Sequence, residues 1–271
     1  MKAVHFHEDT NVEQIGLLKQ PNFKGLRRLT VHVQETSLMP VCRKLEELLP
    51  CFRRLKSFKF DAVLACTVKQ PEVATVAWRL PAVTRLHVWT TRCPRIIAPR
   101  LRSLCCIDVS PLRFLETVEA ALDLRHLDVC FEGPARREIW QTAPDELKRK
   151  LIERFGKLQL PKLRRLITSN HSGLDLLESD AFCAAVARFS ALQHLSIILL
   201  RKTSPRAVEA MLTALPLLET VELCARYGDN TEAKEDAREL PTERCITLAQ
   251  LKERSEEHTS ELQLHLNLVC R

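Results

Sequence analysis

The chain has 271 residues, of which 45% are hydrophobic and 28% charged, and its formal net charge is +7 at pH 7. This length is enough for a sizeable core, while the longest apolar run, residues 195–200, is too short to span a bilayer. The 11 cysteines include no C-x-x-C pair, so we expect reduced thiols rather than a disulfide framework or a zinc site.

A short phrase recurs along the chain, in which the first, fourth and sixth positions are mostly apolar. Its eight copies are Leu26/Leu29/Val31, Leu55/Phe58/Phe60, Val83/Leu86/Val88, Leu101/Leu104/Cys106, Leu124/Leu127/Val129, Leu163/Leu166/Thr168, Leu192/Leu195/Ile197 and Leu218/Val221/Leu223. Because successive residues of a strand face opposite sides, the fourth and sixth positions are predicted to share one buried face. The short step from Leu86 to Leu104 predicts a reduced unit, and the long step from Leu127 to Leu166 predicts an insertion near residues 131–160.

The segments between the phrases predict helices. Apolar residues at helical spacing cover residues 38–49, 71–80, 111–122, 144–155, 180–189 and 205–215. Ser110-Pro111 and Ser204-Pro205 are typical of an N-cap followed by a first-turn proline. Parallel strands need such crossovers, so the alternation predicts an α/β fold with a parallel sheet.

This pattern resembles the leucine-rich-repeat region of ribonuclease-inhibitor-like and F-box-associated proteins over roughly residues 23–225. The resemblance implies a solenoid with parallel strands on the concave face and helices on the convex face. The chain departs from the family three residues after the last phrase position, where Asn or Cys is common. That position holds Gln34, Val63, Thr91, Val109, Glu132, His171, Leu200 and Arg226, so the turns must close in another way. An ordinary parallel α/β domain rich in leucine remains an alternative.

Three regions are expected along the chain. Residues 1–22 form an N-terminal segment without a recognisable cap, and whether they are the natural start is left open. Residues 23–253 form the leucine-rich-repeat-like solenoid. Residues 254–263 read RSEEHTSELQ, which resembles a translated short-read sequencing adapter, and residues 267–271 match its continuation. We therefore expect residues 254–271 to be a non-native tail, and the chain to be a fragment.

A basic column is predicted on the outward face of the strands. The third position of the phrase, which shares the outward face with the fifth, is interpreted as Arg28, Arg54, Arg85, Ser103, His126, Arg165, His194 and Thr220. Positive groups on neighbouring strands, about 4.8 Å apart, repel one another unless water or an anionic partner screens them. Trp89 is predicted to face outward as an anchor for a partner, with packing under a loop as the alternative. The alternative for the arginines is a solvated face whose side-chain stems cover the leucines beneath.

The predicted partner-binding residues are therefore Arg28, Arg54, Arg85, Trp89, His126, Arg165 and His194. A basic amphipathic helix over residues 144–155, next to Trp140, is a further candidate contact, with a solvated repeat helix as its alternative.

No sequence motif points to catalysis. There is no G-x-G-x-x-G or phosphate-cradling loop, and His5 and His7 have no third metal ligand nearby. We expect a protein-interaction scaffold without enzyme activity, metal or cofactor, located in the cytoplasm or nucleus. The resemblance implies substrate recognition for a cullin-type ubiquitin ligase, although residues 1–22 contain no F-box helices. The alternatives are a direct protein inhibitor or regulator and a basic nucleic-acid-binding solenoid, although no concentrated basic run is present.

Overall fold

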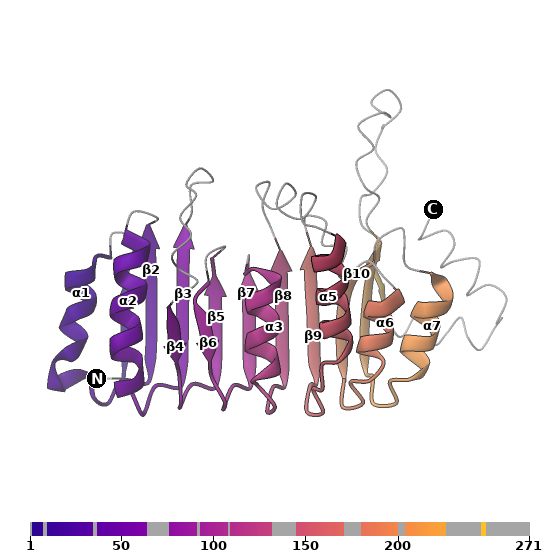
Figure 1. Cartoon of the computed structure of the whole chain (residues 1–271). Helices are drawn as coiled ribbons and strands as arrows, with labels where there is room; N and C mark the ends of the chain where they lie inside the picture. The colour runs from indigo at the N-terminus through magenta and orange to yellow at the C-terminus, as the bar shows by residue number, and fades with distance from the viewer. Residues whose placement is uncertain are drawn as a thin grey trace, which may run out of the picture.

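The computed structural model describes residues 2–7, 10–34, 37–63, 76–90, 93–107, 109–131, 145–170, 180–199, 204–225 and 245–247. These residues form an α/β fold on a ten-stranded sheet, in which nine strands run parallel and the last is antiparallel (Figure 1). The predicted tail at residues 254–271 and residues 132–144 of the predicted insertion, which include Trp140, lie outside the described residues. In spatial order the strands are β1 (Ala3–Phe6), β2 (Arg28–Gln34), β3 (Ser57–Val63), β5 (Arg85–Trp89), β7 (Ser103–Ile107), β8 (His126–Phe131), β9 (Arg165–Asn170), β10 (His194–Leu199), β11 (Thr220–Ala225) and β12 (Cys245–Thr247).

Each copy of the apolar phrase lies on one parallel strand, and neighbouring copies are in register. Leu29 on β2 pairs with Phe58 on β3, which pairs with Leu86 on β5. The fourth and sixth phrase positions are buried along the sheet, as Leu29 (1% exposed) and Val31 (0%) illustrate. The predicted α/β fold with a parallel sheet is therefore confirmed, and the sheet gains β1 from the N-terminal segment.

Helices cover one face of this sheet (Figure 1). They are α1 (Val12–Gly16), α2 (Leu38–Leu48), α3 (Pro111–Glu119), α5 (Asp145–Gly156), α6 (Asp180–Val186) and α7 (Pro205–Thr213), joined by the 3₁₀ turns η1 (Leu17–Lys19), η2 (Pro21–Phe23) and η4 (Leu49–Cys51). Their buried residues recur at helical spacing, as Leu38, Val41, Cys42 and Leu45 do on α2. Among the described residues, none of the helices has the length and apolar character needed to cross a membrane.

The helix predicted over residues 71–80 is wrong for the part that the structure describes. Strand β4 (Ala77–Arg79) lies there instead and pairs in parallel with β6 (Arg95–Ile97) on the helix-covered side of the large sheet (Figure 1). The unit between Leu86 and Leu104 is too short for a strand, a helix and two turns, so an extended segment crosses instead. Strand β4 then pairs with that segment, so that its backbone N–H and C=O groups find hydrogen-bond partners.

Backbone hydrogen bonds link neighbouring units in the turns that lead into the parallel strands. The carbonyl of Lys56 accepts the N–H groups of Thr84 (2.9 Å) and Arg85 (3.0 Å) in the next unit. The carbonyl of Arg102 does the same for Arg125 (2.8 Å) and His126 (3.0 Å). This two-bond link recurs before the parallel strands and fixes the register at their N-terminal ends.

Candidate functional site

The face of the sheet opposite the helices carries three rows of outward side chains, and we call it the open face. Row one contains Arg28, Ser57, Arg85, Ser103, His126, Arg165, His194 and Thr220. Row two contains Thr30, Lys59, His87, Cys105, Asp128, Ile167, Ser196 and Glu222. Row three, followed over β2 to β7, contains His32, Asp61, Trp89 and Ile107. No described helix or strand packs against this face.

Row one carries an unbalanced positive charge. Arg28, Arg85 and Arg165 are exposed, and none of them forms an ion pair with another described residue. The structure places His126 and His194 in the same row, also exposed, as the sequence predicted. Burial, followed by the positive charge of Arg165, lowers the pKa of His126 below its usual value. The row therefore disfavours further positive charge and favours an anion.

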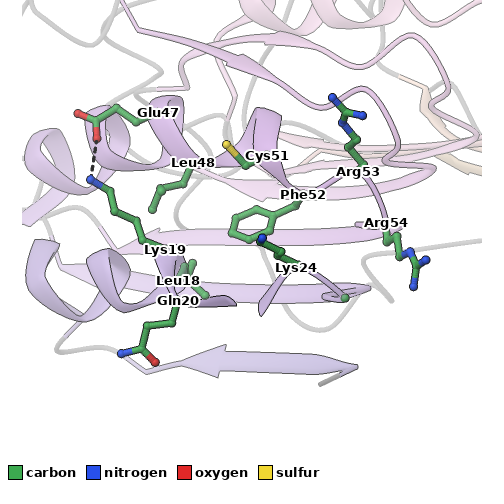
Figure 2. Close-up of a pocket in the computed structure, with 11 residues that line it drawn as sticks. Leu18, Lys19, Gln20, Lys24, Glu47, Leu48, Cys51, Phe52, Arg53 and Arg54 are labelled. Carbon is green, nitrogen blue, oxygen red and sulfur yellow. Dashed lines mark ion pairs between the residues drawn. The ribbon is translucent and has the colours of Figure 1, made fainter. Parts of the chain in front are cut away.

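Arg54 is not part of this row, so that prediction is wrong. The register pairs Arg28 with Ser57 and Ser57 with Arg85, which gives the third phrase position on β3 to Ser57. Arg54 precedes Leu55, the first residue of the phrase, and therefore lies in the turn before β3. There it lines a hollow together with Lys19 and Phe52 (Figure 2).

A buried carboxylate lies at the centre of rows two and three. The side chain of Asp61 is 5% exposed, and its Oδ2 lies 2.9 Å from Nζ of Lys59 and 3.1 Å from Nδ1 of His32. Its Oδ1 lies 3.2 Å from Nε2 of His87, an ion-pair distance without the alignment of a hydrogen bond. Burial is the largest influence and favours the neutral acid, but His87 and Lys59 together outweigh it and lower the pKa of Asp61. Asp61 is therefore held as an anion by its own neighbours.

A second carboxylate lies beside this cluster in row two. The thiol of Cys105 lies 3.9 Å from Oδ2 of Asp128. Burial raises the pKa of Asp128 against the opposing influence of Arg165 and His87. Burial first, and then the charge of Asp128, raises the pKa of Cys105 to about 12. Asp61 therefore offsets little of the charge in row one, because His32, Lys59 and His87 already contact it.

Trp89 faces outward, as predicted. It is 43% exposed at the end of β5 and pairs in register with Asp61 on one side and Ile107 on the other. The open face thus combines cations in row one with an exposed aromatic surface in row three, which lies four residues further along the strand, from Arg85 to Trp89.

Sequence reasoning missed the Asp61 cluster because the apolar phrase stops at its sixth position. The outward alternation continues one step further, to His32, Asp61 and Trp89, and this was the available signal. Among the described residues, no group of three or more His, Cys, Asp or Glu could hold a metal ion.

Comparison with known proteins adds no relative. No family model matches the chain, and no curated protein matches its sequence.

Proposed function

We propose that the chain is a protein-recognition scaffold whose open face binds an acidic segment of a partner protein. The observation that carries this proposal is the row of exposed Arg28, Arg85 and Arg165, which form no ion pair with another described residue. We also assign the fold to a leucine-rich-repeat-like solenoid, supported by units that add one strand each to the sheet in chain order.

Physical chemistry favours carboxylates as the groups that row one recognises. The planar guanidinium of arginine donates two parallel hydrogen bonds to a carboxylate, so several arginines along a sheet select an acidic segment. A sheet held in register by backbone bonds loses little conformational freedom on binding, which preserves the energy of those contacts. The exposed ring of Trp89 supplies an apolar contact beside them.

Two biological settings fit such a surface. The resemblance to F-box-associated repeats supports substrate recognition for a cullin-type ubiquitin ligase, and the resemblance to ribonuclease-inhibitor-like repeats supports direct inhibition of a partner. We propose the same contact between row one and an acidic segment in both settings.

Charge reversal on the open face tests the proposal. The probe is a fluorescein-labelled, glutamate-rich peptide, and its affinity is measured by fluorescence anisotropy at two salt concentrations. We expect Arg85→Glu with Arg165→Glu to weaken binding about tenfold, because two favourable charge pairs become repulsive. Since both side chains are exposed, the melting temperature should stay nearly unchanged.

The matched control is Arg79→Glu with Arg95→Glu, which changes the net charge equally at two exposed positions of β4 and β6, on the helix-covered side of the sheet. We expect this control to remain within about twofold of the parent affinity, because only long-range charge changes. Equal weakening in both double variants, or no weakening in the open-face variant, would overturn the proposal.

A further inference from the structure

A second basic surface follows the N-terminal ends of the strands, which form the lower border of the sheet in Figure 1. We call this surface the basic edge. In the turns that lead into β2 to β11, the basic residues are Lys24, Arg27, Arg53, Arg54, Lys56, Arg100, Arg102, Arg125, Lys157, Lys162, Arg164 and Arg188. The acidic residues in the same turns are Asp123 and Glu219. Asp123 pairs with Lys162 and so offsets one of these cations, and Glu219 accepts a hydrogen bond from Gln193. The basic residues still far outnumber the acidic ones, so the edge keeps a positive charge.

One end of the basic edge contains an apolar hollow of about 830 Å³ (Figure 2). Leu18, Leu48 and Phe52 line it and are themselves almost fully buried, at 2%, 5% and 4% exposure. Figure 2 shows Phe52 between Lys19 and Glu47 on one side and Arg53 and Arg54 on the other. The volume lies in the range that holds a small ligand or a large side chain.

The charge around this hollow is positive. Its basic residues are Lys19, Lys24, Arg53 and Arg54. Its acidic residue, Glu47, already contacts Nζ of Lys44 at 2.6 Å and Nζ of Lys19 at 3.9 Å. A group that enters the hollow therefore meets an apolar floor and a cationic rim.

A smaller hollow of about 420 Å³ lies further along the same edge, lined by Lys56, Thr84, Arg100, Arg102 and Asp123. The strands that follow these turns extend from β3 to β8, whereas the first hollow lies next to β2 and β3. Four strand steps separate β2 from β8, roughly 19 Å at the usual strand spacing, which an extended peptide of about six residues spans.

We propose that the basic edge is a second docking surface, for an extended peptide that carries one large apolar side chain followed by acidic residues. The apolar side chain occupies the first hollow, and the carboxylates contact Arg53, Arg54 and then Lys56, Arg100 and Arg102. A nucleic-acid backbone would satisfy the cations but leave the apolar floor without a matching group, so the peptide is the favoured occupant. This surface is separate from the open face, and the proposal does not depend on that face.

Two peptides that differ in one side chain test the proposal. Both are fluorescein-labelled and glutamate-rich, and the first residue is phenylalanine in one and alanine in the other. By anisotropy, we expect the phenylalanine peptide to bind the parent protein on the order of tenfold more tightly, because its apolar ring is transferred from water into the hollow. Arg53→Glu with Arg54→Glu should remove this difference and weaken both peptides.

Two other double variants separate the surfaces. Arg79→Glu with Arg95→Glu should leave the preference for phenylalanine unchanged. Arg85→Glu with Arg165→Glu should also retain that preference, even if it weakens the acidic contact on the open face. Loss of the preference only in the open-face variant would overturn the inference while supporting the open-face proposal.

An exposed thiol at the hollow gives a measurement that does not depend on a variant folding. Cys51 lines the hollow and is exposed, so its alkylation by iodoacetamide can be followed by peptide mass mapping. Saturating phenylalanine peptide should slow alkylation of Cys51 at least about fivefold by covering it, and the alanine peptide should protect it less. Equal affinities and equal protection for the two peptides would overturn the inference. So would an oligouridylate that binds more tightly than both peptides and is lost in the Arg53/Arg54 variant.

Discussion

Asp61 shows how one residue decides the charge of the open face. A buried carboxylate is costly unless polar groups contact it, and His32, Lys59 and His87 supply those contacts from three strands. The ammonium group of Lys59 is therefore paired with Asp61 and adds little free positive charge to the open face.

Asp61→Asn should lower the free energy of unfolding and make it less dependent on pH in the acid range. Folding lowers the pKa of Asp61 below the ordinary value of 3.8, so the folded protein binds fewer protons there than the unfolded chain. The stabilisation is therefore complete above pH 3.8 and is lost as the pH falls through the lower folded value. We expect a loss of about 1–3 kcal/mol at neutral pH, and a smaller difference from the parent in acid, measured by urea unfolding. An unfolding free energy with the same pH dependence as the parent would contradict this account.

Two cysteines should differ sharply in reactivity. Because burial and Asp128 raise the pKa of Cys105 to about 12, its thiol stays protonated in neutral buffer, whereas Cys51 is exposed. We expect iodoacetamide to modify Cys51 at least about a hundredfold faster, as read by peptide mass mapping. Asp128→Asn should speed the reaction of Cys105 only in part, because burial remains. Comparable rates at the two thiols in the parent protein would refute this assignment.

Residue positions were predictable where they follow the period of the strand. Arg28, Arg85, Trp89 and Arg165 were placed outward from alternation alone, and the register confirms this placement. The prediction for Arg54 failed because Arg54 precedes Leu55, the first residue of the phrase, whereas the third position is Ser57. The Asp61 cluster depends on side chains from three strands, which a single sequence does not align.

At the scale of elements, Trp78 packs the strand pair β4–β6 against the large sheet, at a position where a helix was predicted. It is 0% exposed, its ring meets Phe58 and Phe60 edge-on at 5.4 and 4.7 Å, and its Nε1 donates to the carbonyl of Cys42 at 3.1 Å. One side chain thus joins β4, the large sheet and α2.

Replacing Trp78 should therefore be costly. Trp78→Ala leaves a large cavity and should destabilise the protein by about 3–5 kcal/mol, whereas Trp78→Phe should cost less because most of the contact area remains. The measurement is urea unfolding followed by circular dichroism. Trp89→Ala, at an exposed position, serves as the control and should cost less than either change at Trp78. A cost for Trp78→Ala no larger than that of the control would contradict this role.

Helices whose apolar residues recur at helical spacing were predictable from the sequence. A strand that forms because a neighbouring unit pairs with it was not. The apolar spacing located α2, α3, α6 and α7, and the serine-proline signal located the start of α7, where Ser204 accepts the N–H of Ala207 at 3.2 Å. Residues 77–79 form a strand because their backbone groups pair with those of β6. Strand β6 is itself extended because the unit that contains it is too short for a helix.

Across the whole molecule, stacking brings dispersed charges together. The basic residues form no dense run in the sequence, yet one turn in each unit lies on the same border and one strand start in each unit lies on the same row. Sequence composition therefore indicated a basic protein without locating its basic surfaces. Those surfaces follow from the register of the strands.

Methyl NMR of isoleucine-labelled protein tests most directly whether the open face is a docking surface. Ile107 and Ile167 are half-buried on that face, whereas Ile15 and Ile96 are buried on the helix-covered side. On titration with the glutamate-rich peptide in the Arg53→Glu, Arg54→Glu background, we expect the methyl signals of Ile107 and Ile167 to shift while those of Ile15 and Ile96 stay fixed. Shifts at Ile15 and Ile96 without shifts at Ile107 and Ile167 would contradict the account.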